Sequence, residues 1–447
     1  MASPARSPAA APTEPAGGAT AWWMVAVLFL TYAFSWLDRL ILSMLVTPIK
    51  ADLLLSDVQV SMITSTAFAI FYALFGLPLG WAADRYSRRL IIFCGITVWA
   101  SATVACGFAR SYETLLLGRI LVGAGEAALL PAAYSLISDA FARDRLTLAT
   151  SVFQMAGKIG SAAAFGLGGM AIAFATARAG IDLPFHGPAR PWQMVLMMAG
   201  APGFLLAFLV FTFPDPPRRG AGAGGVRAKA TPGAMRDFVR RNAALIGLML
   251  LGTSCLSICG YSMTNWVPAF IERRYGLEPV QYGWWLSAMN LLAAGSLVAS
   301  GGVVDRLYRR GMDDAHLRFY SWLIFGLSPV IVFTFFAPNV WVFLACYGVV
   351  QFITVPFMVY VSSVMALLAP NAIRAQMLAM FLFVFTILGL GAGPAIVAVL
   401  TDHVFRDEAK IGQSLAVVVI GGATIAFVSL RLSLRYLAPA VARNRTA

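Results

Sequence analysis

Five ionisable side chains stand inside long apolar stretches of this 447-residue sequence, and they are the groups best placed to do chemistry. They are Asp38, Arg39, Arg119, Glu126 and Lys158. Charges in a hydrocarbon environment are unfavourable unless they are paired or hydrated, so such residues mark ion and substrate pathways. A buried carboxylate can also take up a proton near neutral pH once its basic partner moves away. Two acids beside three bases therefore predict proton movement coupled to the binding of an anion.

The depth of each charge follows from its position in its predicted helix, at about 1.5 Å per residue. Asp38, Arg39 and Arg119 form an outer tier, roughly 10–12 Å below the outer membrane surface. Glu126 and Lys158 form a second tier near mid-membrane. The alternative is a set of structural ion pairs, but desolvation offsets much of the attraction in a buried pair. A hydrated cavity explains charges at two matched depths better.

The second half of the chain carries no ionisable residue within its predicted helices. Its polar residues there are neutral, such as Asn290, Gln351 and Tyr360, and we expect these to contact substrate opposite the three buried cations. A cationic wall that faces an apolar wall suits an amphipathic molecule. Its anionic head would meet the cations, and its tail would lie against the second half.

Composition and the length of the apolar runs predict the fold class. Hydrophobic residues make up 60% of the chain and charged residues 12%, whereas a soluble domain is usually about a quarter charged. Twelve runs are long enough to span a membrane as helices, which predicts an all-α membrane protein. They lie near 21–46, 57–82, 90–109, 112–138, 146–177, 191–213, 243–269, 279–304, 316–337, 339–368, 373–401 and 411–436.

A motif that occurs twice divides these runs into two bundles of six helices. Gly80-Trp-Ala-Ala-Asp84-Arg85-Tyr-Ser-Arg88-Arg89 returns 221 positions later as Gly301-Gly-Val-Val-Asp305-Arg306-Leu-Tyr-Arg309-Arg310. Parallel membrane repeats place the substrate site at the interface between the halves. The predicted segments are a disordered tail (1–20), a first bundle (21–213), a basic linker (214–241), a second bundle (242–437) and a second tail (438–447).

The distribution of basic residues predicts the orientation. With the N-terminus inside, the cytoplasmic segments hold 22 Lys and Arg residues and the opposite side holds 8. This imbalance follows the positive-inside rule, so we expect both termini in the cytoplasm. The net charge of +13 therefore reports membrane orientation, and we expect no nucleic-acid partner. The protein should be a monomer in a bacterial cytoplasmic membrane, in contact with lipids and a small amphipathic substrate.

An enzyme is not expected. The sequence has no P-loop, no metal-ligand spacing and no Cys/His constellation, and its five cysteines all lie in apolar runs. We expect no metal and no cofactor other than a proton as the coupling ion. A non-transporting receptor or a lipid scramblase is the alternative from another class, although a scramblase should work without a proton gradient.

The twelve helices, the basic linker and the duplicated turn resemble the major facilitator superfamily. Leu37-Asp38-Arg39, the turn from Gly80 to Arg89, and Gly123-Ala-Gly125-Glu126-Ala127 followed by Pro131 and Ser135 resemble its spinster branch. The resemblance implies a rocker-switch carrier, and spinster-like carriers are associated with lysolipids and sphingoid phosphates. Neighbouring branches with a similar first half are symporters of small organic anions, and a polar second-half wall would favour that alternative.

The resemblance also implies roles for single residues. Asp38 and Glu126 would be the protonatable pair, and Arg39 and Arg119 would support them or bind substrate. The duplicated turn would supply a cytoplasmic gate that closes against the eleventh helix. Its candidate residues are Gly80, Asp84, Arg85, Arg89, Asp305 and Arg306.

Overall fold

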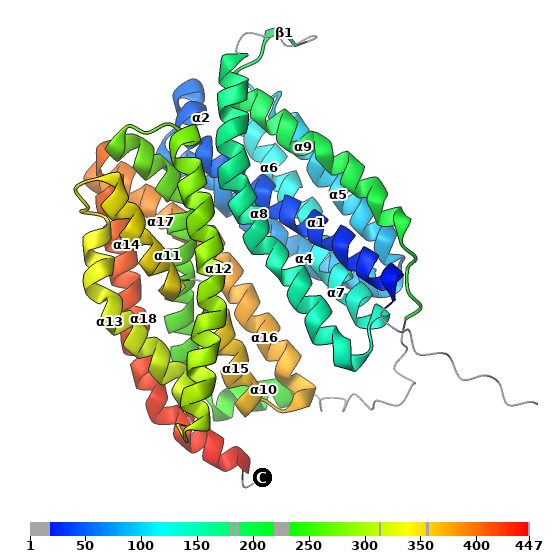
Figure 1. Cartoon of the computed structure of the whole chain (residues 1–447), viewed down its shortest axis with the longest axis vertical. Helices are drawn as coiled ribbons and strands as arrows, with labels where there is room; N and C mark the ends of the chain where they lie inside the picture. The colour runs from blue at the N-terminus through cyan, green and yellow to red at the C-terminus, as the bar shows by residue number, and fades with distance from the viewer. Residues whose placement is uncertain are drawn as a thin grey trace, which may run out of the picture.

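The computed structural model describes residues 18–178, 182–183, 187–218, 233–312, 314–354 and 357–445. Most of the predicted N-terminal tail, the middle of the predicted linker and the last two residues lie outside the described residues. The described chain is almost entirely helical, and its helices form two bundles that stand side by side (Figure 1). This arrangement confirms the predicted all-α, two-bundle membrane architecture.

The first bundle contains the helices up to residue 212. They are α1 (Ala19–Ile41), η1 (Leu42–Met44), α2 (Val46–Leu53), α3 (Asp57–Ser61), η2 (Met62–Thr66), α4 (Ala67–Arg85), α5 (Arg88–Cys106), α6 (Tyr112–Glu126), α7 (Leu129–Ala140), α8 (Arg143–Ala177), α9 (Pro191–Leu209) and η3 (Val210–Thr212). Two short strands, β1 (Asp182–Leu183) and β2 (Gly187–Pro188), pair antiparallel between α8 and α9. We call the end of the molecule with this pair the hairpin end and the opposite end, where the interdomain linker lies, the linker end.

The second bundle follows a short helix at the linker end, α10 (Ala234–Arg241). Its elements are α11 (Ala243–Tyr275), α12 (Pro279–Arg309), α13 (Ala315–Thr334), α14 (Val340–Thr354), α15 (Phe357–Leu368), α16 (Asn371–Phe385), η4 (Thr386–Ala392), α17 (Gly393–Val399), η5 (Leu400–Phe405), η6 (Glu408–Lys410) and α18 (Ile411–Arg445). Within the described residues, eleven helical segments are long and apolar enough to cross a membrane. The predicted run 339–368 corresponds to α14 and α15, which lie on either side of residues 355–356, outside the described residues.

Several helices are longer than their apolar runs. Helix α11 reaches Tyr275, so Glu272 and Arg273 are helical and the second half does carry charges within a helix. Helix α18 continues to Arg445, through most of the predicted C-terminal tail. Apolar runs underestimate such helices because Glu and Arg are good helix formers that extend a helix into the polar interface.

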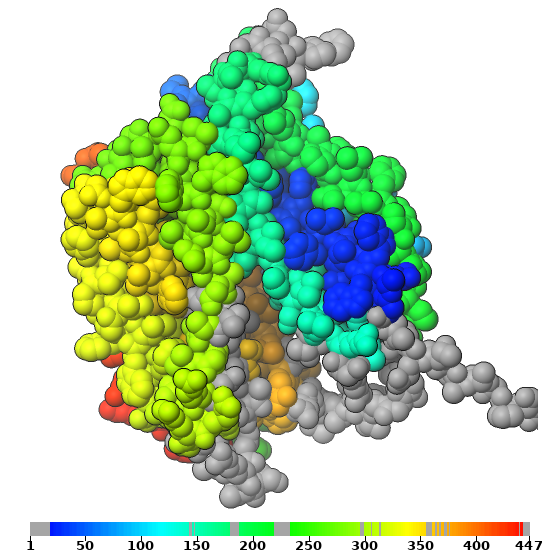
Figure 2. Space-filling view, viewed as in Figure 1, coloured from blue at the N-terminus to red at the C-terminus, as the bar shows by residue number. Residues whose placement is uncertain are grey.

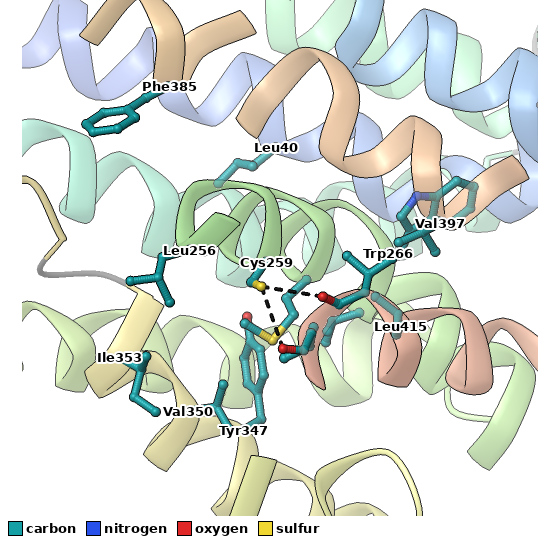
Figure 3. Close-up of a cluster of buried hydrophobic side chains, with 14 of the residues drawn as sticks. Leu40, Leu256, Cys259, Trp266, Tyr347, Val350, Ile353, Phe385, Val397 and Leu415 are labelled. Carbon is teal, nitrogen blue, oxygen red and sulfur yellow. Dashed lines mark hydrogen bonds between the residues drawn. The ribbon is translucent and has the colours of Figure 1, made fainter. Parts of the chain in front are cut away.

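The core of the second bundle is built around α11. Leu256, Cys259 and Trp266 project from it among side chains of α14 and α18 (Figure 3). The Trp266 indole donates to the Pro394 carbonyl at 2.9 Å, and the Cys259 thiol lies 3.6 Å from the Val418 carbonyl oxygen. These contacts fix α11, which also lines the interface between the bundles.

Glycines determine how closely the helices of the first bundle approach one another. A Cβ on Gly125 would lie 2.8 Å from the Gly95 carbonyl oxygen, and one on Gly123 would lie 2.7 Å from that of Phe68. Helix α6 therefore contacts α5 and α4 at backbone distance, directly before its last residue, Glu126. The predicted run 112–138 breaks after that residue, shortly before Pro131, because proline cannot donate a helical hydrogen bond.

We predict that Gly160→Ala destabilises the protein. Its new Cβ would overlap the Ala33 carbonyl where α8 crosses α1, and overpacking of this kind costs about 1–3 kcal/mol. Thermal melting of the detergent-solubilised protein measures the effect. Gly247→Ala is the control, because nothing lies within 4 Å of a Cβ there. Equal melting temperatures for the two variants would contradict this account of the crossing.

Candidate functional site

The buried pair Arg39–Glu126 joins α1 to the end of α6. An Nη atom of Arg39 lies 2.5 Å from Glu126 Oε2, and Arg39 Nε donates to the same oxygen at 2.7 Å. The Ser35 hydroxyl donates to it as well, at 2.7 Å. The Glu126 side chain is fully buried, and that of Arg39 is 14% exposed. One oxygen of the carboxylate therefore faces three donor atoms.

Aromatic rings enclose the guanidinium of Arg39. Its central carbon lies 5.4, 4.7 and 5.0 Å from the ring centroids of Trp36, Phe68 and Tyr72. Such cation–π contacts are worth about 0.5–2 kcal/mol when water is excluded. They give the cation a favourable environment that does not depend wholly on the charge of Glu126.

A second buried pair lies between Asp38 and Arg119. An Nη atom of Arg119 is 3.6 Å from Asp38 Oδ2, and the Thr103 hydroxyl donates to that oxygen at 3.1 Å. Arg119 Nε also donates to the Ile63 carbonyl at 3.3 Å. Within the described chain, Asp38 Oδ1 and Glu126 Oε1 are buried without a hydrogen-bond partner. Each carboxylate thus has one oxygen where a proton could bind.

The structure pairs these charges differently from the predicted depth tiers. Glu126 was grouped with Lys158, but it contacts Arg39, which was placed in the outer tier. The reason is that side chains on a helix lean towards its N-terminus, so the long Arg39 side chain reaches back past Ser35. Among the described residues, no carboxylate lies within 4 Å of the Lys158 amine.

Lys158 lies instead on the wall of a cavity between the two bundles. The cavity has a volume of about 700 Å³, part of it open to solvent, and is lined by Trp36, Lys158, Ser161, Ser257, Gly260, Tyr261, Thr264, Asn290, Gln351 and Thr354. The space-filling view shows a hollow between α8 and α12 towards the linker end, with α16 visible behind it (Figure 2).

Two of the three predicted second-half residues, Asn290 and Gln351, line this cavity. The Gln351 amide is held between the Tyr347 hydroxyl at 3.3 Å and the Thr354 hydroxyl at 3.1 Å. Tyr360 is not among the lining residues. It is stacked on Tyr320 in the core of the second bundle, with ring centroids 4.1 Å apart.

The expectation of an apolar second-half wall is wrong. Ser257, Tyr261 and Thr264 of α11 line the cavity beside Asn290 and Gln351. Counting only ionisable residues missed these hydroxyl groups. Their spacing of four and three residues, which places them on one face of a helix, was the signal that could have found them.

A smaller pocket connects the cavity to the buried pair. Both are lined by Trp36, Tyr261 and Thr264, and the smaller one also by Arg39, Thr64, Phe68 and Asn265. Leu40 and Leu390 complete its lining, so the guanidinium of Arg39 has beside it a largely apolar space with a few polar groups, on the side that leads to Lys158.

The hairpin end is closed by polar contacts between the two halves, which the sequence did not predict. Asp57 accepts hydrogen bonds from Lys50 at 2.5 Å and from Arg273 at 2.8 and 2.9 Å. Lys50 also lies 2.9 Å from Glu408. Thr47 donates to Glu272, and the Val58 N–H donates to Asp402 at 2.8 Å. We call the contacts that join the two halves, which exclude the Lys50–Asp57 bond within the first half, the hairpin-end seal.

The duplicated turns lie at the linker end. Asp84 and Arg85 are exposed, with Arg85 against the Trp81 ring. Arg89 donates to the Phe213 carbonyl at 2.6 Å, and a Cβ on Gly80 would lie 3.7 Å from Pro131. In the second turn, Arg306 is exposed in α12, and the side chain of Asp305 lies outside the described residues. The predicted contact with the eleventh helix, which begins with α16, thus stays a prediction.

Comparison with known proteins gives the family. Residues 28–394 match the Major Facilitator Superfamily. An MFS-type efflux pump of Mycolicibacterium smegmatis is 28% identical over 414 residues, which cover 90% of each chain. The mouse sphingosine-1-phosphate transporter is 27% identical over 254 residues, 56% of this chain but only 43% of that longer protein.

The fold agrees with that family. The crystal structure of a bacterial homologue of the human lysosomal transporter Spinster, in an inward-facing and occupied conformation, superposes with a TM-score of 0.76. It shares 20% sequence identity, and the match covers 95% of this chain and 97% of that one. The family match over most of the chain, on a fold of two helical bundles around a central cavity, shows that this protein is a membrane transporter of the Major Facilitator Superfamily.

Proposed function

We propose that the protein is a proton-coupled secondary transporter of an amphipathic, anionic substrate. The observation that carries this proposal is the position of Lys158, on the cavity wall with no carboxylate partner among the described residues. A cation left unpaired at this depth is unfavourable, and an anionic substrate group would neutralise it. Asn290, Gln351 and the α11 hydroxyls offer hydrogen bonds to the neutral parts of the same head group.

The substrate tail would leave the cavity between α8 and α12. These helices touch near the hairpin end, where a Cβ on Gly166 would lie 3.1 Å from Trp284. Towards the linker end the same helix faces carry Met155 and Leu291, both exposed. An apolar passage beside a cationic site suits a lysolipid or sphingoid phosphate, and the similarity to a sphingosine-1-phosphate transporter supports this class.

The polar second-half wall favours a second candidate, proton symport of a small organic anion. Every second-half side chain that lines the cavity is polar, apart from Gly260. A hydroxylated acid without a tail could use these groups and Lys158 equally well. The two candidates differ in whether a long apolar tail improves binding.

Proton coupling follows from the charges around Arg39. Protonation of Glu126 would remove the anion that holds Arg39, and the guanidinium could then turn into the pocket beside it, towards Thr64, Thr264 and Asn265. A second positive charge near Lys158 would strengthen the binding of an anion. By linkage, bound anion would favour protonation of Glu126 to the same extent.

Alternating access would exchange the hairpin-end seal for closure at the linker end. We expect the linker end in the cytoplasm because basic residues concentrate there, so the cavity would face inward when the seal is closed. In the opposite state, we infer that Asp84 and Arg85 close the cytoplasmic side against α16. Both are exposed in the structure described here, with Arg85 against the Trp81 ring.

We predict that Asp38→Asn and Glu126→Gln each abolish substrate uptake driven by a pH gradient in proteoliposomes. Neither amide can carry a proton through the cycle, and both changes are nearly isosteric, so the fold should survive. Glu113→Gln is the matched control, because Glu113 is an exposed acid at the start of the same helix as Glu126. Wild-type rates and pH dependence in both buried variants would show that the coupling assignment is wrong.

We predict that Lys158→Gln weakens the binding of lysophosphatidate about 10- to 100-fold, the loss of one charge-assisted hydrogen bond. Lys158→Arg should retain most of the affinity. Ligand-induced thermal stabilisation measures both, since a bound ligand raises stability by mass action. If short sugar acids stabilise the protein and lysophosphatidate does not compete, the organic-anion candidate replaces the lipid candidate.

A further inference from the structure

Two π-helical segments meet at the interface between the bundles. One is η2 (Met62–Thr66), which leads into α4, and the other is η4 (Thr386–Ala392), which follows α16. The Thr66 hydroxyl donates to the Gly391 carbonyl at 2.7 Å, and the Thr64 hydroxyl donates to the Asn265 amide oxygen at 3.3 Å. Isolated π-turns are rare and often occur at functional sites. Here the hydrogen bonds of Thr64 and Thr66 join the π-turn η2 of the first half directly to the second half.

The buried charges reach the same segment from the other side. Arg119 Nε donates to the Ile63 carbonyl, in the middle of η2, at 3.3 Å. The same guanidinium lies 3.6 Å from Asp38. A continuous set of contacts therefore runs from Asp38 through Arg119 and the backbone of η2 to Thr66 and Gly391.

The π-turn is an element with two accessible forms. In η2 the Ala67 N–H bonds to the Met62 carbonyl, five residues back, where an α-helix would use the fourth. Return to the α-helical register would rotate the residues on one side of the turn and withdraw Thr66 from Gly391. The guanidinium of Arg119, bonded to the Ile63 carbonyl, stabilises the π-helical form of η2, because charge-assisted hydrogen bonds are stronger than neutral ones.

We propose that Arg119 is a positioning residue that couples the charge on Asp38 to the closure of the hairpin end through η2. The inference rests on the proposed proton coupling at Asp38. Protonation of Asp38 removes the anion that orients Arg119, so the guanidinium leaves the Ile63 carbonyl, η2 changes register and the contact from Thr66 to Gly391 is lost. The hairpin end then opens more readily. This reassigns Arg119, which is fully buried and absent from both cavities, from substrate binding to conformational coupling.

The surroundings of Asp38 identify the groups that decide this response. The charged or titratable side chains that face it are Arg119 and Glu126 of α6, Arg39 of its own helix and the Cys106 thiol of α5. Lys158 of α8, the longest helix packed on α1, lines the cavity instead. Arg119 is the member of this group that also contacts η2.

A double-mutant cycle on opening of the hairpin end tests the proposal. Spin labels on the two halves at that end report the fraction of open molecules of the full-length protein in nanodiscs, at a series of pH values. Asp38→Asn and Thr66→Val should each raise the open fraction. Both changes act on the same linkage. The factor by which the double variant changes the open fraction should therefore differ at least about twofold from the product of the two single-variant factors. Thr66→Ser, which keeps the hydroxyl, should behave as wild type.

Thr47→Val provides the matched control. It removes another threonine hydroxyl bond between the halves, to Glu272, from α2, whereas the hydrogen bond and ion pair of Arg119 go to Ile63 and Asp38. The change in the open fraction caused by Thr47→Val should be independent of Asp38→Asn, so that the double variant shows the product of the two single effects. One contrary result is that the effect of Thr66→Val is independent of Asp38→Asn in the same way, while the open fraction of the wild-type protein still changes with pH. That result overturns the linkage through η2 and leaves the proposed proton coupling in place. A wild-type open fraction that does not change with pH overturns both.

Discussion

A charge inside a membrane is unfavourable unless it is paired or hydrated, and the salt bridge between Arg39 and Glu126 pairs two such charges with each other. The pair is possible because Gly123 and Gly125 let α6 approach α4 and α5 at backbone distance, which brings Glu126 to the face of α1. We propose that it is reversible, because the aromatic rings around Arg39 and the pocket beside it would give the cation a favourable environment without Glu126. Buried pairs add little to stability, so a pair that can be exchanged is better explained by transport than by folding.

The two halves contribute different chemistry to the same cavity. The first half supplies the amine of Lys158, which has no carboxylate within 4 Å among the described residues, and it holds both buried carboxylates behind the cavity wall. The second half supplies neutral hydrogen-bonding groups on α11, α12 and α14, and its Glu272, Arg273, Asp402 and Glu408 hold the hairpin end closed. An anion that binds between the halves therefore contacts both bundles, and its charge changes the balance of the pairs that keep Arg39 in place.

Much of this could be predicted from the sequence, because membrane helices and buried charges leave strong signals. The all-α two-bundle fold, the five buried charges, and Asn290 and Gln351 on the cavity wall could all be read from the sequence before the structure was known. The pairing of the charges could not, because side-chain reach and helix rotation decide it. The seal at Asp57 was missed because its residues stand at the polar ends of helices. Tyr360 was expected at the substrate site but packs in the core, because a tyrosine side chain suits either a core or a cavity wall and only the packing of its neighbours distinguishes the two.

The central claim is that Glu126 takes up a proton when an anion draws Arg39 towards the cavity. Infrared difference spectroscopy tests it most directly, because a protonated carboxyl group has its own C=O stretching band. Addition of lysophosphatidate to the purified protein at constant pH should produce that band in wild type and in Glu113→Gln. The band should be absent in Glu126→Gln. An unchanged band in Glu126→Gln, or none in wild type when lysophosphatidate is bound, would contradict the account.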